Sequence, residues 1–441
     1  MIVVLLVASG LAGCTQAAAN EATVTVLGSW TGAEQAGFLA MVRGFERTTN
    51  NRIHVNYIGT RDAPAVLAND VKNGDTPDLA VLATPGVMHE YAATGILLPI
   101  NGALDSQAMK SWYGPSWLQL MQTAGPSGTN AYYAIIVKAA LKSAIWYDPG
   151  QLSKAYQSAL TSSNLTWEGL MSLAAGLPAT GQAPWCIGMA DSSNSGWPGT
   201  DWIEDIVLHQ FGLQVYDEWV DGKLAWNSPQ IMEAFREFGQ VAANPEVVPS
   251  ELATSYSDVG QAMFTGPPGC YLDHEGSFIT GFYAQDGLGF ANSASHPQPG
   301  SGFDFIPFPP LTASDRNNIE VAGDLLGMIR NTPAARALIN YLTTPQAQEA
   351  WISRPESGAI SVNQSVPLSE YPDPVSRDIA KDLIQAANVR FDASDSMPAT
   401  MSTAFNNAVL EYLDDPPQLE TILNGLDHVQ KAAYGGPGFS S

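Results

Sequence analysis

Three residues close together in the sequence combine two kinds of group that suit a polar ring-shaped ligand. Trp197 and Trp202 flank Asp201 in a stretch that also holds Gly and Pro. An indole face packs against apolar surface, and a carboxylate accepts hydrogen bonds that are costly to leave unmade. The stretch is therefore predicted to bind a ligand with C–H faces and hydroxyl groups. The alternative is structural, with Asp201 in the first turn of a helix and Trp202 in a core.

Motifs of catalysis are absent from the chain. There is no Gly-x-Ser-x-Gly nucleophile motif, no His-Glu-x-x-His pair and no phosphate-binding loop. The 6 His residues are scattered and give no metal-binding pattern. We therefore expect a protein that is not an enzyme and that needs neither a cofactor nor a metal ion. A glycoside hydrolase remains the rival from another class, because it requires only two carboxylates.

The composition bounds the possible partners. The chain has 441 residues, with 43 acidic against 19 basic side chains and a formal net charge of −24. Such a charge disfavours electrostatic binding to nucleic acid or to an anionic membrane. Any membrane attachment would therefore have to come from a lipid group. A chain of this length, with 45% hydrophobic residues, can form two domains or one large composite.

The first 14 residues form a short apolar run that ends in Leu-Ala-Gly-Cys. The run is too short to span a bilayer permanently and fits the apolar region of a secretory signal. Its ending resembles the lipobox of bacterial lipoproteins, which implies a diacylglyceryl group on Cys14 and a location on the outer face of the cell membrane. No Lys or Arg precedes the run. The alternative is a buried N-terminal strand with an incidental Cys.

Two further cysteines remain, Cys186 and Cys270. An even pair in an oxidising compartment favours a disulfide, which would stabilise the fold by about 4–5 kcal/mol in the chain-entropy treatment. The alternative is two buried free thiols.

The elements that must position these residues follow an alternating order. Strand patterns at residues 23–27, 52–57 and 78–82 are each followed by apolar residues at helical spacing. This order predicts a parallel doubly wound sheet, in which ligands bind beyond the carboxyl ends of the strands. Later segments with strand character are residues 132–140, 144–148 and 319–329. Later helices are expected at residues 201–211 and after the start signals at Thr166, Thr332-Pro333 and Thr344-Pro345.

Four groups of segments, taken in order, resemble the extracellular solute-binding proteins of carbohydrate ABC importers. They are Thr76-Pro77-Asp78-Leu79 with residues 90–99, Ile145-Trp146-Tyr147-Asp148-Pro149 with residues 165–168, residues 260–266, and residues 345–348 with residues 358–363. A narrower likeness, to the α-glucoside-binding branch with its similar cysteine pair, lies in residues 184–186, 196–205, 270–274 and 391–395. The chain departs from that branch at residues 274–277, where a basic residue and Gln are usual.

The resemblance implies an α/β fold of two lobes, each a doubly wound sheet, joined by three hinge crossovers near residues 135–140, 321–325 and 388–395. After a signal at residues 1–14 and a tether at 15–22, lobe 1 would hold residues 23–137 and 323–390. Lobe 2 would hold residues 138–322 and 391–441. A mono- or oligosaccharide, by the narrower likeness an α-glucoside, would bind between the lobes and pass to the transmembrane subunits of the permease. We expect a monomer. The alternative ligand is another polyol-like solute, such as an amino sugar or a glycerophosphodiester.

The same resemblance places further ligand contacts at strand ends and near the crossovers. These candidates are Trp30, Thr31, Glu34, Asp78, His274, Glu275, Asp324, Arg354 and Asp395. Each has a plainer alternative: loop packing for Trp30, a favourable first-turn position for Glu34, and a strand start for Asp78. His274 and Glu275 would otherwise form a polar turn, and Arg354 and Asp395 would be surface charges.

Overall fold

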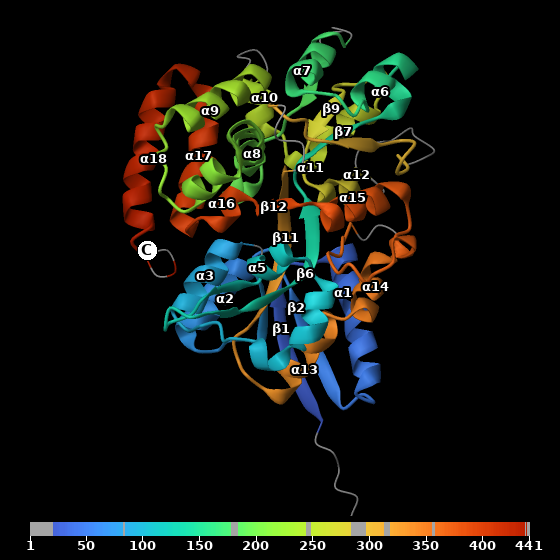
Figure 1. Cartoon of the computed structure of the whole chain (residues 1–441), viewed down its shortest axis with the longest axis vertical. Coiled ribbons are helices and arrows are strands. Elements are labelled where there is room, and N and C mark those ends of the chain that lie inside the picture. Colours follow the sequence, from blue (N-terminus) through green and yellow to red (C-terminus); the bar gives the residue numbers. More distant parts are fainter. Residues whose placement is uncertain are drawn as a thin grey trace, which may run out of the picture.

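The computed structural model describes residues 21–82, 84–177, 184–243, 248–283, 297–312, 318–354, 358–436 and 438. The molecule has two lobes stacked along its long axis (Figure 1). Within these residues no helix is both long and apolar enough to cross a membrane. Cys14, the predicted signal segment and most of the predicted tether lie outside the described residues.

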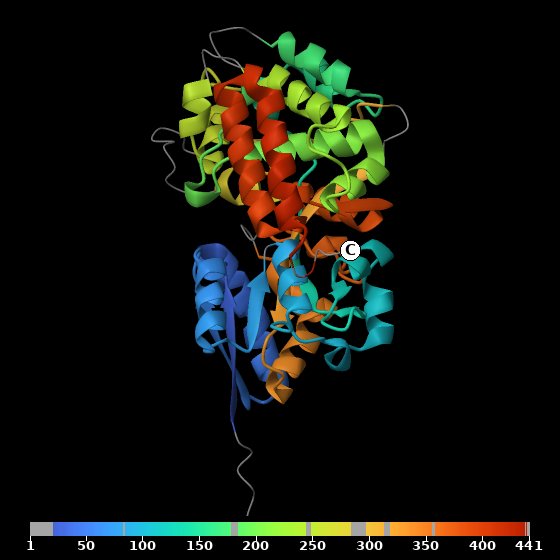
Figure 2. The ribbon, with the colours of Figure 1, turned by 90° about the vertical axis from the view of Figure 1, so that its left-hand side faces the viewer.

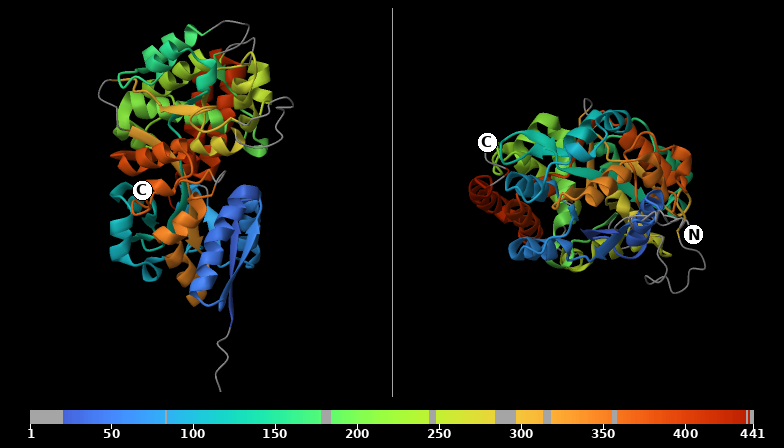
Figure 3. Two further views of the ribbon diagram at one scale, coloured as in Figure 1. Left: turned by 90° about the vertical axis from the view of Figure 1, so that its right-hand side faces the viewer. Right: turned by 90° about the horizontal axis from the view of Figure 1, so that it is seen from below.

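The lower lobe in Figure 1 is built on parallel strands. β1 (Ala22–Gly28) lies between β2 (Ile53–Gly59) and β3 (Leu79–Leu82) and is parallel to both. They are connected by α1 (Gly32–Thr48) and α2 (Ala63–Asn73). Figure 3 shows these N-terminal elements, in blue, along one edge of the lobe. The predicted order of strand and helix is thus confirmed for this half of the sheet.

The rest of this sheet is mixed, so the predicted parallel arrangement holds for β1 to β3 and does not extend to every strand. β11 (Asn318–Met328) pairs antiparallel with β3 through its second half and antiparallel with β6 (Ala134–Leu141) along its other edge. Its first half pairs parallel with β12 (Asn388–Phe391). β11 runs antiparallel to β3 because the chain returns to this sheet from the other lobe. These three strands, predicted as the crossovers, lie at the junction of the two lobes (Figure 1).

The upper lobe has a small sheet and a large helical layer. Its strands are ordered β10 (Asp304–Pro307), β7 (Ala144–Tyr147), β9 (Leu272–His274) and β8 (Trp185–Cys186). Its main helices are α8 (Trp197–Val220), α9 (Pro229–Ala242), α17 (Ala399–Asp414) and α18 (Leu419–Ala433). Figure 2 shows α17 and α18 side by side across this lobe. Their buried faces share a core with α8 that is rich in Trp and Phe.

A disulfide joins two strands of the upper sheet. Cys186 ends β8, and Cys270 lies just before β9. Their Cα atoms are 5.2 Å apart, which is a usual separation for a bridged pair. The predicted disulfide is therefore present. It fixes the position of β9, whose last residue is one of the candidate site residues.

The remaining elements complete the two lobes. Three of the predicted helix starts are confirmed, because the hydroxyls of Thr166, Thr332 and Thr344 accept hydrogen bonds from first-turn amides. The further bounds are α3 (Pro85–Ala93), α4 (Ser106–Trp112), α5 (Pro115–Leu120), β4 (Gln122–Ala124), β5 (Asn130–Tyr132), α6 (Lys154–Leu160), α7 (Trp167–Ala175), α10 (Val248–Ala253), α11 (Tyr256–Val259), α12 (Thr280–Tyr283), α13 (Pro333–Leu342), α14 (Pro345–Ile352), α15 (Pro374–Gln385) and α16 (Ala393–Ser396).

Candidate functional site

A cavity of about 220 Å³ lies where β6, β11 and the segment after β12 pass between the lobes. Three predicted site residues, Trp197, Asp324 and Asp395, line it. The other lining residues were not singled out from the sequence. They are Lys138, Ala139, Ala140, Lys142, Phe278, Ala322, Gly323, Asp392 and Ser394. The strands that connect the lobes therefore also supply much of the wall of this cavity.

The aromatic side of the cavity is held by the start of α8. Trp197 is the first residue of that helix, and its Nε1 donates to Asp191 Oδ2 at 2.9 Å. Its ring packs edge-on against Tyr256, with centroids 4.8 Å apart, and lies 5.9 Å from the ring of Phe278. Gly196 precedes it with φ of 103°, where a Cβ would meet a backbone carbonyl oxygen at 2.2 Å. Only Gly therefore permits this turn, which aims the indole at the cavity.

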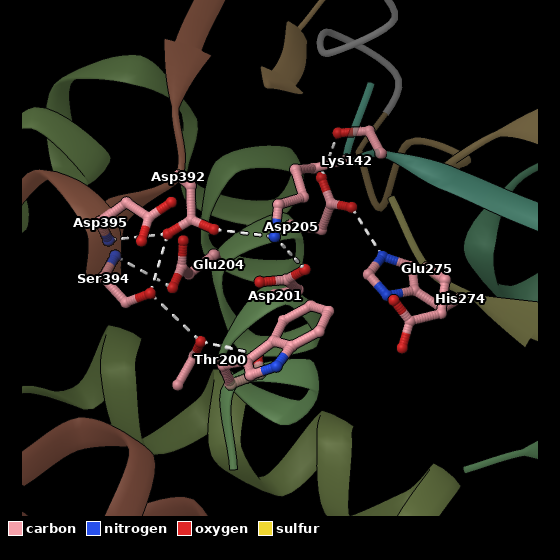
Figure 4. Close-up of polar contacts among 12 residues, drawn as sticks. Lys142, Thr200, Asp201, Glu204, Asp205, His274, Glu275, Asp392, Ser394 and Asp395 are labelled. Atoms are coloured by element: carbon pink, nitrogen blue, oxygen red, sulfur yellow. Dashed lines mark hydrogen bonds and ion pairs between the residues drawn. The ribbon is translucent and has the colours of Figure 1, made fainter. Parts of the chain in front are cut away.

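Lys142 forms the polar floor of the cavity. Its Nζ lies 2.6 Å from Asp201 Oδ2 and 3.1 Å from Asp392 Oδ2, as Figure 4 shows. It also lies 4.7 Å from the centroid of the Trp197 ring, a cation–π distance. Burial alone would lower the pKa of Lys142, but the two carboxylates raise it well above its usual value. Lys142 is therefore a buried, permanently charged group.

A second lysine, Lys138, connects α1 with β11 in the lower lobe. Lys138 pairs with Glu34 of α1 and lies 3.3 Å from Asp324 of β11. Asp324 also accepts a hydrogen bond of 2.8 Å from Trp30 Nε1. Burial would raise the pKa of Glu34, but Lys138 and Arg61 lower it. The structure thus brings together three predicted residues, Trp30, Glu34 and Asp324, around a cation that the sequence reasoning missed.

Other buried acids brace the floor from below. Glu204 accepts from the backbone amides of Ala393 and Ser394, the latter at 3.1 Å, and so ties α8 to α16 (Figure 4). Asp205 lies 2.8 Å from His274 Nε2 and close to His209. Burial alone would raise the pKa of Asp205, but the hydrogen-bonded imidazole of His274 and the nearby imidazole of His209 bring it to about 2. These contacts hold α8 against the strands that carry the cavity.

Several predicted contacts lie elsewhere and follow their structural alternatives. Trp30 is 1% exposed and packs against Trp351 and Phe38, so it supports Asp324 without lining the cavity. Trp202 is 2% exposed, and its ring centroid lies 5.0 Å from that of Trp185 in the upper core. It is too deep in the core to reach the cavity.

Asp78 occupies the amino end of β3, whereas the cavity lies beyond the carboxyl ends of the strands. Its carboxylate accepts from the backbone amide of Thr25 at 2.8 Å and lies 3.2 Å from Arg330 Nε. It therefore links β1 and the segment after β11 to the amino end of β3.

The remaining predicted residues, His274, Glu275, Thr31 and Arg354, do not line the cavity. His274 ends β9 and Glu275 follows it, and both side chains are buried. Glu275 accepts a 2.7 Å hydrogen bond from Trp146 Nε1 through its backbone carbonyl. Thr31 precedes α1, and Arg354 follows α14.

The residues that sequence reasoning missed carried a readable signal. Lys138 lies inside, and Lys142 directly after, a run that is otherwise apolar from Ala134 to Leu141. In a chain with only 19 basic residues, one lysine within a buried strand and another directly after it indicate buried carboxylates nearby. Asp392 lies within residues 391–395, where the narrower likeness predicts a contact only for Asp395. Burial and the neighbouring Asp392 raise the pKa of Asp395 well above its usual value.

The chain is similar to proteins of one family along most of its length. Residues 29–349 match the family described as bacterial extracellular solute-binding protein. The chain is 30% identical over 399 residues to the alpha-glucosides-binding periplasmic protein AglE of Rhizobium meliloti, covering 89% of this chain and 83% of that relative. It is 32% identical over 408 residues to the osmoprotective compounds-binding protein GgtB of Synechocystis sp., covering 90% of this chain and 91% of that relative. Its fold is similar to that of a solved chitin oligosaccharide binding protein, with a TM-score of 0.74, 17% identity, and coverage of 94% of this chain and 100% of that one.

Proposed function

This chain belongs to the bacterial extracellular solute-binding proteins, and we propose that it is the sugar-binding subunit of an ABC importer, with a small α-glucoside as its ligand. The membership confirms the predicted family. It also removes the glycoside hydrolase as a rival, because the matched family and the two named relatives are binding proteins. The relative named for α-glucosides supports the choice of ligand.

The observation that carries the proposal is the composition of the cavity wall. The cavity is lined by an aromatic pair, Trp197 and Phe278, and by the polar groups of Asp324, Ser394 and Asp395. A pyranose ring has apolar C–H faces and a rim of hydroxyls, so it needs both kinds of surface. The carboxylate of Asp395 has no hydrogen-bond partner among the described residues. It is therefore free to accept from a ligand hydroxyl.

The proposal also covers the boundaries between the lobes, the membrane anchor and the transfer of the sugar to the permease. The lobes would divide at residues 137/138, 322/323 and 390/391, so that the ligand is enclosed when the lobes rotate together. The mature chain would be held on the outer face of the membrane by lipid on Cys14. It would act as a monomer and pass the sugar to the permease.

Isothermal titration of the purified protein with a panel of mono- and oligosaccharides tests the ligand. Trp197→Ala and Asp395→Asn should each weaken binding of the best α-glucoside by about 1–3 kcal/mol, the range for a packed aromatic or a charged hydrogen bond. The matched controls are Trp112→Ala, at the end of α4 outside the cavity lining, and Asp414→Asn, an exposed acid at the end of α17. Both controls should bind normally. Unchanged affinity in both cavity variants would contradict the site.

A second candidate ligand class has support of its own. The relative that is 32% identical is named for osmoprotective compounds, so small osmolytes belong in the panel beside amino sugars and glycerophosphodiesters. A thermal-shift screen ranks these classes before titration, because a ligand at about 100 times its Kd stabilises the folded state by about 2.7 kcal/mol. If only a class other than α-glucosides shifts the melting temperature, the ligand assignment is wrong while the family assignment stands.

A further inference from the structure

A group of charged residues lies beneath the cavity, where the three connecting strands meet α8. Lys142 follows β6, Glu320 lies on β11 and Asp392 follows β12, while Asp201 projects from α8. One carboxylate oxygen from each of Asp201, Glu320 and Asp392 lies within 4.8 Å of the other two. All three acids are 2% exposed or less. Each connecting strand therefore brings one charged residue to a single buried point.

The charges at this point do not balance. Three carboxylates face one ammonium, because Lys142 is the only Lys or Arg that forms ion pairs with these acids in the described part of the chain. Both carboxylate oxygens of Glu320 and the Oδ1 atom of Asp201 are buried without a hydrogen-bond partner among the described residues. Leaving such groups charged and unpaired in a protein interior is costly. Three buried carboxylate oxygens are thus left without a partner among the described residues.

We propose that Asp201, Glu320 and Asp392 form a binding site for one divalent cation that prefers oxygen ligands, with Ca²⁺ as the best fit. Carboxylates are ligands of Ca²⁺, Mg²⁺ and Mn²⁺. Two oxygens on one Ca²⁺ ion can be up to about 4.6–5.2 Å apart, which is twice the Ca²⁺–oxygen distance. An oxygen set within 4.8 Å is compatible with that limit, and Ca²⁺ accepts irregular oxygen geometry, whereas Mg²⁺ demands a near-ideal octahedron with bonds of about 2.0–2.1 Å. Lys142 neutralises one carboxylate and the cation neutralises the other two.

The position of the site gives the ion a structural effect. Asp392 also lines the cavity, so an ion can approach from the space between the lobes. Once bound, it would join β11, the segment after β12 and α8 at the hinge. We therefore expect the ion to stabilise the fold whether or not a sugar is bound, so that the test below requires no sugar.

Metal content and melting temperature test the site directly. The purified protein is stripped with a chelator, dialysed against Ca²⁺ and then against metal-free buffer, and analysed for retained calcium. One calcium ion per chain and a melting temperature several degrees above that in chelator are expected. Tb³⁺ in place of Ca²⁺ should give luminescence sensitised by Trp197, whose ring lies 4.7 Å from Lys142. No retained metal and no shift with Ca²⁺, Mg²⁺ or Mn²⁺ would overturn the proposal.

The decisive variant is Glu320→Gln, which keeps the shape of the side chain and removes its charge. It should retain no calcium and show no Ca²⁺-dependent shift, yet in chelator it should melt no lower than the wild-type protein, because an unpaired buried charge is gone. The control Glu411→Gln, an exposed acid on α17, should behave as wild type. A Ca²⁺ response that survives in Glu320→Gln would refute the ligand set. The proposal would also be refuted if the metal-free wild-type protein became more stable on acidification but did not respond to Ca²⁺. Protons, and not a metal ion, would then balance the charge.

Discussion

Replacing Lys142 with Met should destabilise the protein more than the loss of any exposed cation. The ammonium is within 3.1 Å of two buried carboxylates, and the side chains of the three residues are 6% exposed or less. Removing one member of a buried ion pair typically costs about 3–5 kcal/mol, because the partner is left charged and unpaired. Since folded proteins are stable by only about 5–15 kcal/mol, this loss would be a large part of the total.

Denaturant unfolding, followed by Trp fluorescence at neutral pH in chelator, measures the effect. Asp201→Asn alone should cost less, about 1–3 kcal/mol, because Lys142 keeps Asp392 as a partner. The double variant should cost less than the sum of the two, with a coupling of about 1–3 kcal/mol. The pair Lys223 and Asp221 is the matched control, with a similar contact of 2.7 Å but with both side chains more than half exposed. Lys223→Met should leave the unfolding midpoint almost unchanged.

The result that would refute this reasoning is a small loss in Lys142→Met, below about 1 kcal/mol, as found for surface pairs. Strict additivity in the cycle would refute it as well. Either result would mean that the carboxylates take up protons at neutral pH and that the ion pair adds little net stability.

Three further predictions concern other parts of the molecule. Replacing Cys186 and Cys270 with Ala should lower the free energy of unfolding by about 2–5 kcal/mol, and a reducing agent should then no longer change the melting temperature. The free energy of unfolding should be highest near pH 4–5 in metal-free buffer. Burial raises the pKa of Asp273 to about 7, so the folded state gains stability from this group as the pH falls from 7 towards 4. The pKa of Asp205 is about 2, so the stability that this group contributes is lost below about pH 4. A melting-temperature series from pH 3 to pH 8 checks this, and a maximum at or above pH 7 would contradict it. Cys14→Ser should move the protein from the membrane to the soluble fraction, and retention on membranes would defeat the lipoprotein hypothesis.

The sequence predicted the elements better than the contacts between them. The spacing of apolar residues located β1 to β3 and the helices between them, because one face of each must be buried. It could not give the direction of β11, since strand polarity depends on the path of the chain through the other lobe. Local sequence also could not decide whether Trp202 faces the cavity or the core, because both sides of α8 are covered near its start.

Only those site residues that carry a local sequence signal could be predicted. Trp197, Asp324 and Asp395 could be found because an aromatic or acidic residue next to Gly or Pro, or near a crossover, suggests a ligand contact. Lys142 could not be assigned, because its partners are 59 and 250 positions away in the sequence and meet it only after both lobes have formed.

The ladder between β6 and β11 limits how the lobes can move. These antiparallel strands are paired from Leu141 opposite Val321 to Ala134 opposite Gly327, with an irregularity between Asp324 and Leu325. Moving one lobe along this ribbon would have to stretch or compress two extended strands, whereas twisting the ribbon changes each dihedral angle only slightly. The junction is therefore softer to torsion about the ribbon axis than to displacement along it. A partner protein that touches both lobes would sense the occupied state as a change in a single angle.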